Sequence, residues 1–203
     1  MTQAKSDARA QAAADPRADA RTTDTHAKAR PDARKEAGQE ALYRVLDGLG
    51  IAYTVTGHEA AFTVEQADRL YGHLPGAHAR NLFLRNKRGQ RHYLVVAGSH
   101  TPVNLRALRD MLDESTLSFA SPERLMRYLG LNPGSVSPFG LINDREHAVR
   151  VILDRHLLDC ETLNFHPNVN TATLTLSRTD FERFLAACGN EVRRVTLPGA
   201  PAP

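Results

Sequence analysis

The sequence Asn81-Leu82-Phe83-Leu84 is followed, after a polar stretch that contains Lys87-Arg88-Gly89, by His92-Tyr93-Leu94-Val95-Val96. Both apolar runs are rich in residue types that favour β-strands. The short charged segment with a glycine between them is typical of a hairpin turn. We therefore predict two antiparallel strands joined by this turn.

Capping and turn residues divide the sequence on either side of this hairpin into further elements. Thr63-Val64-Glu65-Gln66 is a capping box that predicts a helix to about Leu74, and Ser121-Pro122-Glu123 is typical of a helix start, with Gly130 at its end. Other helices are expected at 42–49, at 104–112 and after Ser177 or Thr179; strands at 51–55, 117–119, 149–153, 162–165, 171–176 and 192–197; and a loop at 132–143. Helices and hairpins mix without strict alternation, so we predict an α+β fold with a mixed, largely antiparallel sheet.

The apolar residues are confined to the part of the chain that follows the first forty residues. Between Thr2 and Ala41 there is no Val, Ile, Leu, Phe, Tyr or Cys, so a helix there could bury nothing against a core. We expect residues 1–41 to be a disordered tail, residues 42–197 to be one domain, and residues 198–203 to be a short C-terminal tail.

Composition excludes several classes of function. The chain of 203 residues has a formal net charge of +3, which argues against a polybasic, histone-like binder. It has no apolar stretch of the length that a membrane span needs and no signal-peptide pattern, so we expect a cytoplasmic protein. The two cysteines, Cys160 and Cys188, lack the paired spacing of a zinc site and are interpreted as reduced thiols.

Three local features are candidates for function. The loop Gly134-Ser135-Val136-Ser137-Pro138 has the residue types that bring backbone N–H groups close to a ligand, although it could also be a plain connection. His166 ends one expected strand and Asn170 begins the next, where a lone histidine could equally be structural. Arg80-Asn81 places a cation and an amide at a strand entrance, where an arginine can also be a solvated charge.

In this order, the three features resemble the prolyl-tRNA-synthetase-associated (YbaK-type) editing domain family, particularly its free-standing branch that deacylates alanyl-tRNA(Pro). The stretches that carry the resemblance are His58 with 61–67, Asn81-Leu82-Phe83-Leu84, Ser118-Phe119-Ala120-Ser121, Leu129-Gly130, 133–144, Phe165-His166-Pro167 and Asn170-Thr171-Ala172-Thr173. The resemblance as a whole extends over nearly all of residues 42 to 197. The resemblance implies a curved, partly barrel-like sheet with helices around it.

The resemblance also implies trans-editing, the hydrolysis of a mischarged aminoacyl-tRNA. An aminoacyl ester is already activated, so its cleavage requires a positioned water and donors for the oxyanion rather than a metal or a covalent nucleophile. We therefore expect no cofactor. The expected partners are the acceptor end of tRNA and prolyl-tRNA synthetase, without DNA or membrane.

Carried onto this sequence, the resemblance implies roles for particular residues. Catalytic candidates are Arg80, Gly134, Ser135 and His166, with the loop from Gly134 to Pro138 supplying backbone donors near the scissile carbonyl. Substrate-binding candidates are Asn81 for the adenosine or its sugar, Phe62, Val136 and Phe165 for the apolar walls of the amino-acid pocket, and Pro138 and Asn170.

The sequence departs from the family pattern at Arg80, where the family has lysine. Residues 42–203 contain 17 arginines and a single lysine, Lys87. Arginine keeps the positive charge and can bind a phosphate with two N–H groups. Two alternatives stay open: a deacylase for another small aminoacyl group such as Cys or Ser, and a non-catalytic module that binds aminoacyl-tRNA or a nucleotide.

Overall fold

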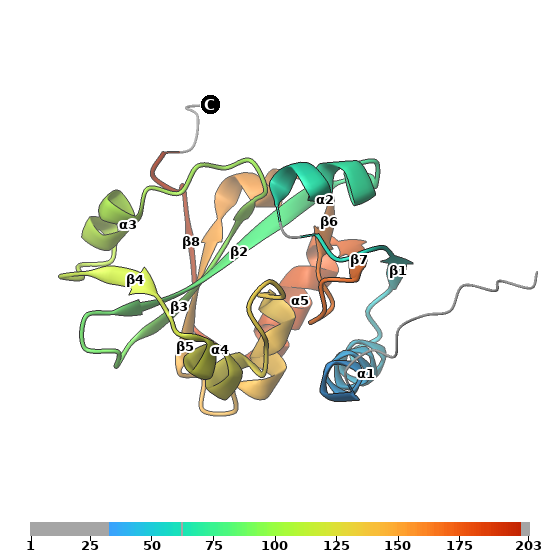
Figure 1. The fold of residues 1–203 in the computed structure, drawn as a ribbon, viewed down its shortest axis with the longest axis horizontal. Helices are drawn as coiled ribbons and strands as arrows, with labels where there is room; N and C mark the ends of the chain where they lie inside the picture. Colours follow the sequence, from blue (N-terminus) through green and yellow to red (C-terminus); the bar gives the residue numbers. More distant parts are fainter. Residues whose placement is uncertain (1–32, 62, 200–203) are drawn as a thin grey trace, which may run out of the picture. The chain divides into compact units, whose positions relative to one another are not determined.

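The computed structural model describes residues 33–61 and 63–199, which form an α+β domain with one mixed sheet (Figure 1). The helices are α1 (Ala33–Gly48), α2 (Val64–Tyr71), α3 (Leu105–Met111), α4 (Pro122–Leu129) and α5 (Arg178–Cys188), with two 3₁₀ helices, η1 (Pro138–Asn143) and η2 (Arg155–Asp159). The strands are β1 (Tyr53–Gly57), β2 (Ala77–Asn86), β3 (His92–Gly98), β4 (Leu117–Phe119), β5 (Val149–Asp154), β6 (Thr162–Phe165), β7 (Ala172–Ser177) and β8 (Val192–Val195).

The strand order is β1-β7-β6-β2-β3-β5-β8, and β4 pairs with the far end of β2. The predicted hairpin is the antiparallel pair β2–β3, in which Asn81 lies opposite Val96. Three neighbouring pairs are parallel, namely β2–β6, β3–β5 and β5–β8. The sheet is therefore mixed, as expected, but it is open: β1 and β8 stand at its two ends, so the expected barrel-like closure is not formed.

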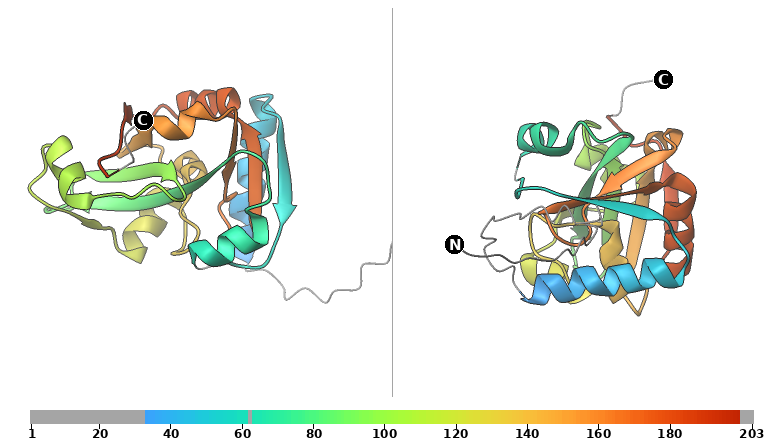
Figure 2. Two further views of the ribbon diagram at one scale, coloured as in Figure 1. Left: turned by 90° about the horizontal axis from the view of Figure 1, so that it is seen from above. Right: turned by 90° about the vertical axis from the view of Figure 1, so that its right-hand side faces the viewer.

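Side chains of the central strands point alternately to the two faces of the sheet, and both faces are buried. Leu94 and Val96 of β3 pack into a core that also contains leucines of α1 and α4 and phenylalanines of α5. Tyr93 and Val95 point to the other face, where Leu108 of α3 packs on them. Figures 1 and 2 show these helices around the sheet, with α3 far from α1 and α5. The part of the chain described contains no helix both long and apolar enough to cross a bilayer.

The helix starts agree with the capping residues in the sequence. The side chain of Thr63 accepts a hydrogen bond from the N–H of Gln66, Asn104 caps α3 in the same way, and Ser121 and Ser177 cap α4 and α5. Local capping chemistry thus predicted where α2, α3 and α4 begin, and for α5 the structure selects Ser177 of the two expected caps, Ser177 and Thr179.

Two boundaries differ from expectation. Helix α1 begins at Ala33, several residues before the expected domain start at 42, while residues 1–32 of the expected tail and residues 200–203 lie outside the described residues. The expected loop at 132–143 contains the 3₁₀ helix η1, which Ser137 caps by accepting a hydrogen bond from the N–H of Phe139. A run with proline at its start and glycine within it does not show helical periodicity, so η1 was not predicted.

His92 at the start of β3 is a neutral histidine held inside the domain. Its side chain is buried between Phe83 and Tyr128, and the Arg124 Nη1 atom lies 3.0 Å from its Nε2. Burial, followed by the positive charge of Arg124, lowers the pKa of His92 to about 4. Since an arginine can only donate, Nε2 accepts this hydrogen bond and the proton lies on Nδ1.

This depressed pKa predicts acid lability. Because the folded pKa lies below the unfolded value of 6.5, the stabilisation is complete above pH 6.5 and is lost as the pH falls toward 4. At roughly 1.4 kcal/mol for each pKa unit, the free energy of unfolding should fall by on the order of 2–3 kcal/mol over this range. Urea unfolding at several pH values measures this dependence of the free energy of unfolding on pH. His92→Gln should make the dependence weaker, and His73→Gln, at an exposed position, should leave it unchanged. Parallel profiles for the parent and His92→Gln would contradict the assignment.

Candidate functional site

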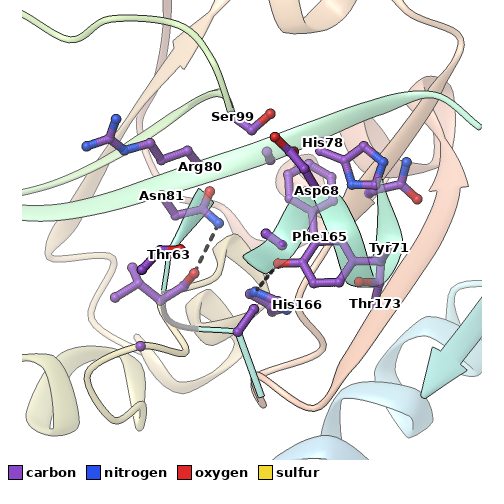
Figure 3. Close-up of a pocket in the computed structure, with 16 residues that line it drawn as sticks. Thr63, Asp68, Tyr71, His78, Arg80, Asn81, Ser99, Phe165, His166 and Thr173 are labelled. Carbon is purple, nitrogen blue, oxygen red and sulfur yellow. Dashed lines mark hydrogen bonds between the residues drawn. The ribbon is translucent and has the colours of Figure 1, made fainter. Parts of the chain in front are cut away.

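A cavity of about 310 Å³ lies between α2, the first half of β2, the loop that precedes η1, and the ends of β6 and β7 (Figure 3). Six of the predicted site residues line it, and they come from segments far apart in the sequence. These residues are Arg80, Asn81, Gly134, Val136, Phe165 and His166. The fold therefore brings together the three features that were separate in the sequence.

The other predicted residues are placed differently. Ser135, Pro138 and Asn170 are buried and are absent from the residues that line the cavity. Asn170 packs behind the loop, since its Nδ2 lies 3.8 Å from the point where a side chain on Gly134 would begin. Phe62 lies outside the described residues, so its predicted place in the pocket wall stays a prediction.

Two side-chain hydrogen bonds hold the loop in place. The amide Nδ2 of Asn81 donates to the carbonyl oxygen of Val136 at 3.0 Å, and the hydroxyl of Ser137 donates to the carbonyl oxygen of His166 at 2.6 Å. Ser137 is fully buried. A buried hydrogen bond fixes geometry because breaking it leaves a polar group without a partner. The loop is thus fastened to β2 on one side and to the end of β6 on the other.

Two residues of the loop that line the cavity have a backbone N–H without an acceptor among the described residues. The N–H of Ser135 is occupied, since it donates to the carbonyl of Asn132 at 3.1 Å. Within the described part of the chain, the N–H groups of Gly134 and Val136 have no acceptor, and both residues line the cavity. Gly134 has φ +84°, a conformation that glycine adopts without strain. The donors that remain for a ligand oxygen are therefore those of Gly134 and Val136.

His166 lines the cavity, and its Nε2 is a hydrogen-bond acceptor that faces the hydroxyl of Tyr71. Its Nδ1 lies 3.0 Å from the carbonyl oxygen of Ala172, which can only accept, so the proton is on Nδ1 and Nε2 is an acceptor. The hydroxyl of Tyr71 approaches Nε2 at 3.5 Å. Burial lowers the pKa of His166, so that the neutral form is the one present at neutral pH.

Sequence reasoning did not find Tyr71, which is buried beside the cavity. Its ring centroid lies 4.3 Å from that of His58, 5.7 Å from that of His78 and 5.8 Å from that of His166. The His58 ring nitrogen Nε2 is in turn 3.0 Å from the hydroxyl of Thr173. A helical signal was present, since Thr63, Ala67 and Tyr71 line the cavity at spacings of four. The sequence does not show which residues this face of α2 contacts, because those contacts depend on the tertiary fold.

Arg80 is the cation at the cavity. Its side chain is exposed, and among the described residues it has neither a hydrogen bond nor an ion pair. Figure 3 shows it extending away from His166 on the opposite side of β2. The cysteines lie elsewhere: both are free, and burial raises the pKa of the Cys188 thiol to about 12, which keeps it protonated.

The geometry at His166 predicts its protonation state. Long-range ¹⁵N–¹H NMR correlations should show a proton on Nδ1 and none on Nε2 at neutral pH, with a titration midpoint below the usual value of 6.5 because burial disfavours the charged ring. The exposed His73 serves as the reference signal in the same spectra. A midpoint of His166 above that value, or a proton on Nε2, would contradict the assignment.

Comparison with known proteins relates this site to a family. The family model described as aminoacyl-tRNA editing domain matches residues 58–184, a range that contains the whole cavity. The prolyl-tRNA editing protein ProX of Acetoanaerobium sticklandii is 38% identical over 78% of this chain and 97% of its own. The mouse prolyl-tRNA synthetase associated domain-containing protein 1 is 33% identical over 74% of this chain and 90% of its own.

A solved structure with a provisional assignment as a trans-editing enzyme for prolyl-tRNA synthetase shares the fold. Its TM-score is 0.60 with 18% identity, over 78% of this chain and 96% of that chain. The extent of the family match, together with the two relatives, shows that this chain belongs to the aminoacyl-tRNA editing domain family.

Proposed function

We propose that this protein is a trans-editing deacylase that hydrolyses the ester of mischarged Ala-tRNA(Pro). The observation that carries the proposal is that Gly134 and Val136, whose N–H groups have no acceptor among the described residues, line the same cavity as the neutral His166. The similarity to a relative named as a prolyl-tRNA editing protein supports the choice of tRNA.

The cavity is suited to ester hydrolysis by water. Water adds to the alanyl carbonyl carbon, and the carbonyl oxygen becomes an oxyanion that the N–H groups of Gly134 and Val136 stabilise. The bond to the ribose oxygen then breaks, the ribose oxygen takes a proton, and alanine and free tRNA are released. The neighbouring ribose hydroxyl helps to orient the water. His166 lines the amino-acid pocket, where its Nε2 accepts a hydrogen bond from the substrate in place of the Tyr71 hydroxyl, which lies 3.5 Å away.

Selection of alanine rests on size. Val136 and Phe165 line the cavity as apolar walls that accept a methyl group. An apolar pocket gains only about 1–3 kcal/mol from one extra methylene, so rejection of the larger prolyl ring has to come from steric exclusion. Serine and cysteine differ from alanine by one atom, and their esters are the closest competitors for the same space.

Arg80 binds the terminal nucleotide in this proposal. It is exposed and without a partner at the cavity, which leaves its guanidinium available for a phosphate or for the carbonyl side of the nucleotide. Arginine cannot place a compact ammonium group as the lysine of the family does, but it offers two parallel N–H groups to a phosphate.

Asn81 acts as a positioning residue. Its amide N–H is already donated to the carbonyl of Val136, and this hydrogen bond fixes one of the two donor positions of the loop. The role expected from the sequence, a contact with adenosine or its sugar, would have to use the remaining oxygen Oδ1, which is buried and has no partner among the described residues.

The first test is hydrolysis of purified Ala-tRNA(Pro), with Pro-tRNA(Pro), Ser-tRNA and Cys-tRNA in parallel. We expect loss of the alanyl ester well above the buffer rate, with Pro-tRNA(Pro) unaffected. Arg80→Ala should abolish turnover and Arg80→Lys should retain it, because the contact needs a positive charge. Equal activity of the parent and Arg80→Ala would remove Arg80 from the mechanism, and tight binding of charged tRNA without turnover would favour a non-catalytic module.

The second test separates positioning from binding at Asn81. Asn81→Ala should lower kcat about 10- to 100-fold, because a small displacement of a donor is costly, while the Kd for uncharged tRNA stays unchanged. Arg80→Ala is the matched comparison, since it should weaken binding. A weaker Kd with unchanged kcat in Asn81→Ala would instead assign Asn81 to the adenosine.

A further inference from the structure

A second cavity, of about 420 Å³, adjoins the first beside the C-terminal end of α2. The two cavities share three lining residues, Asp68, His78 and Ser99. Beyond these, much of the lining of the second cavity is main chain, contributed by Gly72, Gly76 and Gly98. The two cavities are therefore neighbours, with Asp68, His78 and Ser99 contributing to both.

The charge of the second cavity favours a hydrogen-bond donor over a phosphate. Asp68 is the carboxylate in its lining, and its side chain is 48% exposed. One oxygen, Oδ1, lies 3.5 Å from Nε2 of His100, whereas no hydrogen bond to Oδ2 is recorded among the described residues. No arginine or lysine is among the described residues that line this cavity. A phosphate would be repelled there, and a neutral N–H group would be accepted.

Arg80 lines the first cavity together with the three residues that the two cavities share. In the β2–β3 ladder Arg80 lies opposite Ala97, and the N–H of Ser99 donates to the carbonyl of His78 at 2.7 Å. Arg80 and His78 are two residues apart and so share one face of β2. Figure 3 shows Arg80 and Ser99 on the side of β2 away from His166, and Asp68 of α2 also lines the first cavity. A cation in the first cavity, beside the residues shared with the second, is suited to the phosphate that joins two nucleosides.

We propose that the second cavity binds the base of the cytidine that precedes the terminal adenosine of tRNA, with Asp68 accepting a hydrogen bond from its amino group. This inference rests on the proposed function, which places the alanylated adenosine in the first cavity. Arg80 then holds the intervening phosphate. Single-stranded ends are recognised in this way, by bases splayed into pockets and read on their edges.

The chemistry distinguishes cytosine from uracil. Cytosine presents an amino group at C4, a donor that a carboxylate accepts, whereas uracil presents a carbonyl oxygen that a carboxylate repels. An asparagine in place of Asp68 can turn its own amide N–H toward that uracil oxygen. The identity of this one residue should therefore set the preference for the penultimate base.

The experiment compares two RNA minihelices that are alanylated chemically and end in C-C-A or C-U-A. For the parent protein, kcat/KM should be at least about 5-fold higher with C-C-A, since a matched base contact contributes about 1 kcal/mol or more. Asp68→Asn should remove or reverse this preference. Glu65→Gln is the matched control, because Glu65 is an exposed carboxylate on α2 that lines neither cavity, and it should keep the parent preference.

Binding of the two uncharged minihelices provides a readout that does not depend on catalysis. A 5-fold tighter Kd for C-C-A, lost in Asp68→Asn, supports the inference even if no ester is hydrolysed, an outcome that would overturn the proposed function alone. Equal kcat/KM and equal Kd for both RNAs with the parent protein overturn the inference. An equal slowing of both RNAs by Asp68→Asn also overturns it, because the carboxylate would then act on the alanyl amino group.

Discussion

The divergence of two paired strands is the constraint on which the site depends. β2 pairs in parallel with β6 at Ala77 and His78 and then continues beside β3, while the chain of β6 turns away after Phe165. Where the two strands diverge, their backbone N–H and C=O groups no longer pair with each other and need other hydrogen-bond partners, and their apolar side chains need other packing contacts. The loop before η1 enters this gap and is bound on both sides, by Asn81 to one strand and by Ser137 to the residue that follows the other. The cavity is the space that the loop leaves unfilled.

This arrangement also explains the electrostatics of the site. His166 lies at the bottom of the gap, where burial keeps it neutral, while Arg80 lies on the outer side of β2 and is exposed. The interior can thus hold a neutral acceptor and backbone dipoles, and the fixed positive charge stays at the rim. The substrate that we propose fits that division, since its phosphates would remain outside while its ester enters. A net charge of +3 is compatible with RNA binding of this limited kind.

Local sequence patterns predicted the structural features that depend on residues close in sequence. They missed the features that depend on contacts between distant segments. The hairpin, the helix caps at Thr63, Asn104 and Ser121, and the short strand β4 follow from spacing within a few residues. The open sheet does not, because parallel pairs such as β3–β5 join segments separated by several other elements. At the site, the glycine loop and His166 were found by their residue types. Tyr71 was missed because its neighbours in the cavity come from three other segments of the chain. The hydrogen bond from Asn81 to the carbonyl oxygen of Val136 was also missed, because the two residues are far apart in the sequence.

The free donors of the loop belong to the main chain, and this has a consequence for how such a site can change during evolution. Every amino acid except proline supplies a backbone N–H, so almost any substitution at position 136 retains that donor while it alters the wall of the pocket. Specificity at this position can therefore drift without loss of the chemistry. The path of the chain depends instead on side-chain identity at three positions, namely Gly134 with its positive φ, Ser137 and Asn81.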